Sequence, residues 1–348
     1  MKQIDNHMTT ESTYMDRAAG ALYGLFIGDA LAMPVHWYYN TKALERDYGY
    51  VKDFMKPRNP HPDSILWRSS YNPPNKRADI LHDQSKYWGQ RGIHYHQFLK
   101  AGENTLNLKL AGELLLLINE QKRYSENEWL DRLVEYMTTP GLHNDTYIEE
   151  YLRHFFIQYA QGCDLTECGR KDENHIGGLS LMLPILVVFG QDRDYARKTA
   201  LSHLALTHDG PSMISGAKII AKIVLDVLNG TSLKDAIATH FLNGRDGKSK
   251  LSFESLLEFP DGSVVGRHFS SACYMEHSIP ATLYLAYKYA GKPEQGLIAN
   301  TMCGGDNAGR GAVLGALLGA EGGFSCWPER WVNGLLNPPD IFSIEMLG

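Results

Sequence analysis

The sequence has few cysteines and little net charge. Only five of its 348 residues are cysteine, and only Cys163 and Cys168 lie close together, so it has neither a disulfide framework nor paired zinc knuckles. We therefore expect a reduced, cytoplasmic compartment. The formal net charge is −6, with acidic and basic residues scattered along the chain, and no basic stripe of the kind that follows a phosphate backbone is present. Nucleic acid is not expected as a partner.

A secretion signal and a membrane-length apolar run are also missing. The first residues, MKQIDNHMTTESTYMDR, are polar and lack the charged start and apolar middle of a signal peptide. The apolar run AAGALYGLFIG ends at Asp29, well short of the roughly 20 residues that span a bilayer. We expect no membrane association, a flexible tail over residues 1–14, and one domain over residues 15–348.

Alternating β-branched runs joined by hairpin turns are absent as well, so no strand is predicted. Apolar residues instead recur at three-and-four spacing, which predicts helices packed into an all-α, single-domain globule. With 43% apolar residues the chain can bury a sizeable core. The irregular stretch from Tyr48 to His96 is too long for a simple connector, and we expect it to cover a site or an edge of the fold. The predicted helices span residues 19–33, 105–121, 127–137, 147–160, 196–206, 215–230, 280–291 and 311–320.

Glycine, by contrast, is abundant, and in two predicted helices it recurs every four residues. These glycines, which share one face of each helix, are Gly20, Gly24, Gly28, Gly311, Gly315 and Gly319. Each costs about 1 kcal/mol of helix propensity relative to alanine, and close backbone approach of the two helices would offset that cost. If the helices run antiparallel, Asp29 and Asp306 converge. The alternative is that both faces only pack against other helices.

Acidic and amide residues stand directly before two long apolar helices. Glu103, Asn104 and Thr105 precede one, and Asp306 and Asn307 precede the other. Taken alone, each cluster is explained by the capping of a helix start. Taken together, two acid-plus-amide clusters that each follow glycine offer the oxygen ligands that suit a hard cation such as Mg²⁺.

Four segments carry a resemblance to a known family. They are GALYGLFIGDALAMPVHW, GENT, NHIGGLSLMLP with LALTHDGPSM, and CGGDNAGRGAVLGALLGA. In this order they resemble the opening helix, the Asp-Asp-Thr motif, the ribose-contacting loop with its Thr-His element, and the closing Gly-Gly-Asp-Thr-Asp-Thr motif of the ADP-ribosylglycohydrolase family, in the branch similar to J-type lens crystallins. The resemblance implies an orthogonal helical bundle that hydrolyses a bond at the ribose C1 of ADP-ribose.

In the family, two carboxylate clusters hold a pair of Mg²⁺ ions. A typical site has four matched carboxylates, whereas this sequence keeps two, Glu103 and Asp306, because Asn104 stands at one acidic position of the first motif and Ala308 at the second acid of the closing motif. Two divalent ions repel one another by several kcal/mol even at an effective dielectric near 20. We therefore predict one weakly bound Mg²⁺ or none, with the guanidinium of Arg310 partly replacing it. The resemblance gives the metal positions as Glu103, Asn104, Thr105, Asp306 and Asn307.

The resemblance also implies catalytic roles. Asp306 and Glu103 are expected to position and activate water, and His36 and His208 to transfer a proton or contact the leaving group. His208 equally suits a helix C-terminus, where a cationic side chain is favoured.

The resemblance further implies a set of ligand-binding residues. Asp29 either anchors the metal loop or caps a turn, and His96 belongs either to an aromatic wall or to a metal clamp. The remaining ligand-binding candidates are Asn174, Gly177, Gly178, Gly304, Gly305 and Arg310.

The expected function is that of a cytoplasmic hydrolase acting on ADP-ribose or on an ADP-ribosylated small molecule or protein. The alternative is a catalytically inactive member of the fold that serves as a nucleotide-binding or structural protein. Hydrolysis of a different small glycoside or amide in the same pocket is a third possibility.

Overall fold

The computed structural model describes residues 2–243 and 252–339, and over those residues it contains helices and no strand. Two isolated bridges, Arg170 with His208 and His175 with Tyr274, are the β-type pairings recorded there. The prediction of an all-α fold is confirmed. The α-helices are α1 (Lys2–Ala32), α2 (Thr41–Tyr48), α3 (Leu106–Gln121), α4 (Glu126–Thr138), α5 (Glu150–Ala160), α6 (Gly177–Phe189), α7 (Arg193–Ala205), α8 (Pro211–Leu228), α9 (Leu233–Ile237), α10 (Asp261–Ser263), α11 (Met275–Lys288), α12 (Pro293–Met302), α13 (Asn307–Gly322) and α14 (Glu329–Val332).

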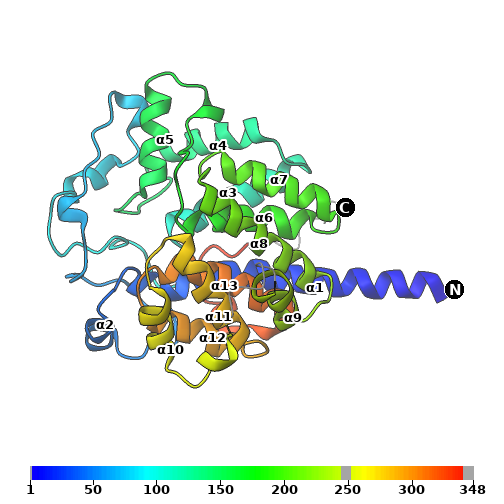
Figure 1. Ribbon diagram of the computed structural model, residues 1–348. Helices are drawn as coiled ribbons and strands as arrows, with labels where there is room; N and C mark the ends of the chain where they lie inside the picture. Colours follow the sequence, from blue (N-terminus) through cyan, green and yellow to red (C-terminus); the bar gives the residue numbers. More distant parts are fainter. Residues whose placement is uncertain (1, 244–251, 340–348) are drawn as a thin grey trace.

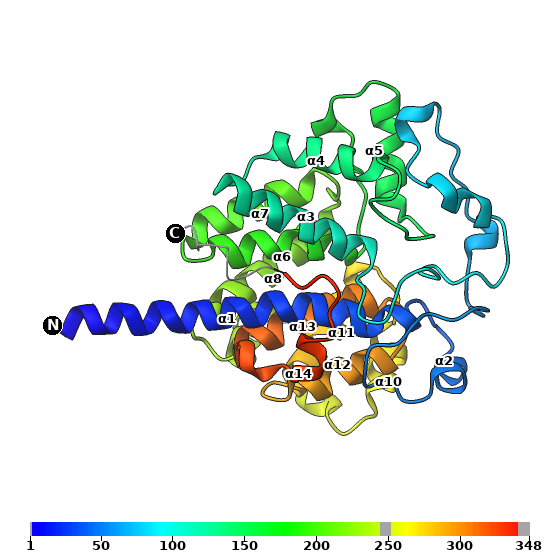
Figure 2. The ribbon, with the colours of Figure 1, turned by 180° about the vertical axis from the view of Figure 1, so that it is seen from behind.

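Helices α1 and α13 lie side by side through the middle of the molecule (Figure 1). Helices α3 to α7 pack on one side of this pair and α10 to α12 on the other, in the front view and from behind (Figure 2). Shorter 3₁₀ and π turns connect or extend them: Met33–Val35, Leu66–Arg68, Lys76–Ala78, His82–Tyr87, Leu165–Glu167, Ala238–Leu242, Glu254–Leu256, Val264–Phe269 and Phe324–Cys326.

The glycine faces of α1 and α13 pack against each other, as predicted. A Cβ atom on Gly24 would lie 2.1 Å from the carbonyl oxygen of Gly315, and one on Gly28 would lie 2.0 Å from that of Gly311. Only glycine permits this approach, so the loss of helix propensity is offset by backbone packing at the centre of the core. The end of α1 therefore lies beside the start of α13.

Residues 2–14 belong to helix α1, and the prediction of a flexible tail over residues 1–14 stays a prediction. Helix α1 already begins at Lys2, and its first turns project beyond the globule (Figure 1). By length and hydropathy, the segment Thr13–Val35 is apolar enough to cross a membrane. However, 94% of an apolar 18-residue stretch within it is buried inside the protein. That burial is typical of a core helix.

Helices α6 and α12 were not predicted. All of α6 is buried, so its apolar residues surround the helix and leave no periodicity to detect, and it contains Pro184. The irregular stretch from Tyr48 to His96 forms only short 3₁₀ turns, as expected from its composition. Its histidines hold the chain after α1, because His61 Nε2 lies 2.9 Å from the His36 carbonyl oxygen and His94 Nε2 3.0 Å from that of Pro34.

Candidate active site

The turn that follows α1 carries His36 into the centre of the molecule. Trp37, the next residue, has a φ of 61°, a left-handed conformation that is uncommon outside glycine. Its ring stacks on that of His36 with centroids 3.8 Å apart. The Trp37 amide donates to the Gly305 carbonyl at 2.8 Å, and the Gly305 amide donates to the Tyr38 carbonyl at 2.7 Å. These bonds fix His36 against the start of α13.

Asp306 is the N-cap of α13 and the partner of His36. Its Oδ1 accepts a hydrogen bond from the Gly309 amide at 3.3 Å and lies 2.9 Å from His36 Nε2. Burial opposes ionisation, but the hydrogen bond and charge of His36, with help from Arg310, bring the pKa of Asp306 below its usual range. Asp306 is therefore a carboxylate at neutral pH, and among the described residues its Oδ2 has no hydrogen-bond partner.

Four buried groups form one hydrogen-bonded chain. Asp145 Oδ1 lies 2.6 Å from His96 Nδ1, His96 Nε2 lies 2.8 Å from His36 Nδ1, and His36 Nε2 contacts Asp306. Each contact needs one proton, and two neutral imidazoles supply only two. Burial lowers the pKa of His36 more than the hydrogen bond and charge of Asp306 raise it, which opposes an additional proton on this ring.

Glu149 is the N-cap of α5 and lines a small pocket together with His36 and His96. Its Oε1 accepts a hydrogen bond from Asn107 Nδ2 at 2.6 Å. Burial, together with the charges of Asp306 and Glu173, raises the pKa of Glu149 to about 7, against the opposing effects of His175 and Asn107. Asp306 does not itself line this pocket, but its charge acts on Glu149; of these two carboxyl groups, one stays ionised and the other holds its proton near neutral pH.

The space between these groups is small and polar. Its volume is about 10 Å³, room for about one water molecule. Its lining comes from the turn after α1, the loop before α3 and the segment before α5, and consists of His36, Trp37, His96, Thr105, Leu106, Asn107, Asp145, Tyr147 and Glu149.

Comparison with known proteins assigns the chain to a family. Residues 10–346 match the ADP-ribosylglycohydrolase family. The chain belongs to this family. An uncharacterized protein of Archaeoglobus fulgidus is 23% identical to it over 325 residues, which cover 92% of each protein. A solved structure of an ADP-ribosylglycohydrolase-related protein complex shares the fold, with a TM-score of 0.64 at 18% identity over 97% of this chain and 98% of the other.

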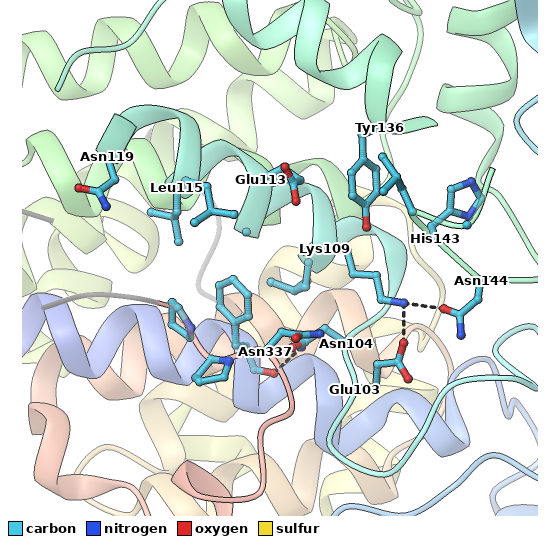
Figure 3. A pocket seen from close by; sticks show the side chains of 18 residues that line it. Glu103, Asn104, Lys109, Glu113, Leu115, Asn119, Tyr136, His143, Asn144 and Asn337 are labelled. Carbon is cyan, nitrogen blue, oxygen red and sulfur yellow. Dashed lines mark hydrogen bonds and ion pairs between the residues drawn. The ribbon is translucent and has the colours of Figure 1, made fainter. Parts of the chain in front are cut away.

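In this chain, the first predicted metal cluster consists of Glu103, Asn104 and Thr105. It does not face Asp306. Glu103 Oε1 accepts from Lys109 Nζ at 2.7 Å, and the pair lines a different cavity (Figure 3). Asn104 Nδ2 and Thr105 Oγ1 donate to the carboxylate of Asp29 at 2.8 and 2.7 Å. Asp29 is buried and holds this loop against α1; no hydrogen bond joins it to Asp306. The two aspartates lie in the same region, but they do not form one cluster of ligands.

In the second cluster, at the start of α13, Asn307 and the neighbouring Arg310 also form hydrogen bonds with other residues of the protein. Asn307 Nδ2 donates to the carbonyl oxygens of Val35 and Thr301, at 3.3 and 2.9 Å. Arg310, predicted to bind an anion, is fully buried, and its Nε and Nη2 donate to Asn300 Oδ1 at 2.7 Å and to the Gly304 carbonyl at 2.8 Å. It ties the glycine loop to α12 and α13, while its Nη1 and Asn307 Oδ1 have no hydrogen-bond partner among the described residues, and its predicted contact with an anion stays a prediction.

These side chains do not fit the paired metal centre of the family. Among the described residues, no group of three or more His, Cys, Asp or Glu side chains is arranged to hold a metal ion. Of the two retained carboxylates, Glu103 is neutralised by Lys109 and Asp306 is held by His36. We therefore derive no chemical step through Mg²⁺.

Several predicted residues serve the packing around the pocket. His208 is fully buried between Gly178, where a Cβ would lie 2.7 Å from its ring, and Tyr151, with ring centroids 4.2 Å apart. It does not line the pocket, its Nε2 has no hydrogen-bond partner among the described residues, and its catalytic role stays a prediction. Gly304 and Gly305, predicted to bind a ligand, have φ values of 64° and 66° and pack against backbone carbonyls instead.

The start of α6 reaches the pocket more closely. A Cβ on Gly177 would lie 2.7 Å from Asn107 Nδ2 and 3.3 Å from Glu149 Oε1, so this glycine lies directly behind the acid. Asn174 contributes its backbone, whose carbonyl accepts from the Met275 amide at 2.9 Å.

Sequence reasoning missed Glu149, Asp145 and Asn107. Glu149 and Asp145 lie in the segment NDTYIEE, where the periodic pattern extends the predicted helix back to Tyr147. Helix α5 in fact begins at Glu150. An acid directly before an apolar helix is the same signal that drew attention to Asp306, and it was available here.

Proposed function

We propose that the protein hydrolyses the glycosidic bond at the ribose C1 of ADP-ribosylated small molecules or proteins in the cytoplasm, using a carboxylate pair without a paired metal centre. The observation that supports the proposal is the divergence of the pKa values of Glu149 and of Asp306, whose charge acts on Glu149. Two carboxyl groups whose environments push their pKa values apart are the usual arrangement of a general base and a general acid.

In this proposal Asp306 is the general base. Its Oδ2 takes a proton from a water molecule in the pocket as the water oxygen bonds to C1 of the ribose. His36 and His96 hold the carboxylate in place and spread the change in charge toward Asp145. Glu149 donates its proton to the leaving oxygen or nitrogen as the bond from C1 breaks. The products are ADP-ribose with a C1 hydroxyl group and a neutral leaving group.

The test is a turnover screen on ADP-ribosyl-arginine, ADP-ribosyl-serine and free N-ribosides. Asp306→Ala and Glu149→Gln are each expected to lower turnover by a factor of about 10² to 10⁴, the usual contribution of one acid or base. Glu135→Gln, which changes an exposed acid of α4, is the matched control. Full turnover in Asp306→Ala would remove the proposed base.

A second candidate is a catalytically inactive nucleotide-binding or structural protein. The narrow pocket, with about 10 Å³ of free space, favours it, because a ribose must displace Trp37 or Tyr147 to enter. The two candidates separate in one comparison. An inactive member shows no turnover on any substrate, and a thermal shift with ADP-ribose then distinguishes nucleotide binding from a purely structural role.

A further inference from the structure

A second and much larger cavity opens on the other side of the loop before α3. Its volume is about 580 Å³, within the range of pockets that bind small molecules. It lies between α3, the end of α4, the segment around His143 and the chain at residues 337–339 (Figure 3). Neither Asp306 nor Glu149 lines it, so this cavity is separate from the catalytic pocket described above.

Two buried polar side chains in this cavity lack partners among the described residues. Asn104 is 3% exposed, and its Oδ1 has no hydrogen-bond donor, although its Nδ2 donates to Asp29 and to the Phe26 carbonyl. His143 is 6% exposed, and neither of its ring nitrogens makes a hydrogen bond of normal geometry, although the Ile80 backbone lies close enough to act on the ring. A buried acceptor or donor without a partner costs about 1–3 kcal/mol. A bound ligand that donates to one and accepts from the other would remove that cost.

The charges that line the cavity cancel. Lys109 pairs with Glu103 at 2.7 Å and also donates to Asn144 at 2.8 Å. Glu113 pairs with Arg132 at 3.1 Å. Burial lowers the pKa of His143 to about 4, although the charge of Asp145 and the backbone of Ile80 act in the opposite direction. The ring is therefore neutral at pH 7 and offers one donor and one acceptor. A charged ligand would find no free counter-charge here.

The apolar part of the lining combines rings and branched side chains. Phe26 and Tyr136 contribute rings, Pro338 and Pro339 contribute further apolar faces, and the leucines of the lining are Leu108, Leu115, Leu116 and Leu142. Gly112 exposes the surface of α3, since a Cβ added there would meet only the Phe26 ring, at 3.8 Å. The rings of Phe26 and Tyr136 can pack against an aromatic ring in offset-stacked or edge-to-face geometry.

We infer that this cavity binds a small, uncharged aromatic molecule whose edge both donates and accepts hydrogen bonds, as a carboxamide does. The ring lies against Phe26 and α3, the N–H of the amide donates to Asn104 Oδ1, and its carbonyl accepts from the His143 ring. The inference does not depend on the proposed hydrolysis, because it uses none of the catalytic groups.

The experiment measures the binding of benzamide to the full chain by calorimetry, with benzoate and benzylamine as charged ligands of the same shape. Benzamide is expected to bind at least tenfold more tightly than either. Gly112→Leu fills the cavity without a clash and is expected to abolish binding. His143→Phe removes one hydrogen bond and is expected to weaken binding about tenfold.

Two further variants test whether binding is specific to this cavity. Gly266→Leu, at an exposed glycine with nothing within 4 Å of an added Cβ, is the matched control and is expected to bind benzamide like the parent protein. Asp306→Asn disables the catalytic pocket and is expected to bind it unchanged. Circular dichroism confirms that each variant is folded. The inference is overturned if benzamide does not bind, if benzoate or benzylamine binds equally well, if folded Gly112→Leu still binds, or if Asp306→Asn abolishes binding.

Discussion

The loops before α3 and α13 are similar in sequence and different in use. Each has glycine, an acid and an amide directly before a long apolar helix: Gly102, Glu103 and Asn104 in one, Gly305, Asp306 and Asn307 in the other. In the loop before α13, the acid caps the helix and binds His36. In the loop before α3, the acid turns away to Lys109 and the larger cavity.

The difference comes from partners that are distant in the chain. Lys109, one turn into α3, forms an ion pair with Glu103. Asp306 instead contacts His36, which lies in the turn after α1, 270 residues earlier in the sequence. A local motif therefore fixes the residue types at a helix start, and the tertiary partners decide whether the carboxylate is structural or reactive.

The largest expected effect is a loss of turnover that distinguishes Asp306 from Glu103. Asp306→Asn keeps the shape of the side chain but removes the base, so turnover is expected to fall by a factor of about 10² to 10⁴. Glu103→Gln leaves Lys109 without its ion pair, so its main effect is expected on stability, with the free energy of unfolding about 3 kcal/mol lower. Steady-state assays and urea titrations of both variants test this contrast. Equal losses of turnover would contradict it.

The second prediction concerns the glycines of the two loops. Gly102 and Gly305 have φ values of 80° and 66°, and an added Cβ would lie 2.0 Å from the Gly334 carbonyl oxygen and 2.1 Å from that of Ser271. Gly102→Ala and Gly305→Ala are each expected to lower the free energy of unfolding by about 3 kcal/mol. Gly112→Ala, in an uncrowded helical position, is the control and is expected to stabilise the protein slightly. Urea unfolding measures all three.

The third prediction uses the pH dependence of turnover and stability to test whether Glu149 is the acid that acts together with Asp306. Glu149 has its pKa raised from 4.5 to about 7, so turnover is expected to fall about tenfold per pH unit above 7, as the acid loses its proton. The folded state also binds this proton more tightly than the unfolded chain. Ionisation of Glu149 therefore destabilises the fold as pH rises from about 4.5 through 7.

Two measurements test that assignment of Glu149. Between pH 4 and pH 8 the parent protein is expected to lose more stability than Glu149→Gln, because only the parent has a Glu149 that ionises. Urea titrations of both proteins at both pH values measure this difference. In Asp306→Asn the neighbouring charge is gone, and the pKa of Glu149 is expected to fall. A parallel pH dependence of stability in the parent and Glu149→Gln would argue against Glu149 as the perturbed acid.

The smallest expected effect is that of metal. Because Glu103 and Asp306 are held by Lys109 and His36, calorimetry with Mg²⁺ is expected to show at most one weak site. Turnover is expected to change less than twofold when EDTA replaces Mg²⁺. Two tightly bound ions per chain would show that these side chains exchange their partners for the metal.

The sequence predicts the part of the fold that depends on periodicity and small residues. Amphipathic helices such as α3 and α8, and the glycine contact between α1 and α13, follow from the spacing of residues on one helix face. Helix α6 could not be predicted in this way, because it is buried on all sides and its pattern has no polar face. Asp306 and His36 were identified as site residues from their motifs.

The identity of the second carboxylate could not be deduced locally. Glu103 and Glu149 both stand near a helix start, but Asn107 of α3 donates a hydrogen bond to Glu149 in the small pocket, whereas Glu103 pairs with Lys109 at the larger cavity. Arg310 and His208, which the family resemblance assigned to a ligand, are both fully buried. Burial and partner choice are properties of the whole fold.

The contact between α1 and α13 also determines when the site forms during synthesis. His36 leaves the ribosome early and Asp306 270 residues later, and the two are joined only when the glycine faces of their helices meet. A nascent chain that ends before α13 exposes the uncovered glycine face of α1 and has no base in its pocket. Folding is therefore expected to be completed after translation, and fragments that lack the C-terminal helices to be recognised by chaperones as unfinished.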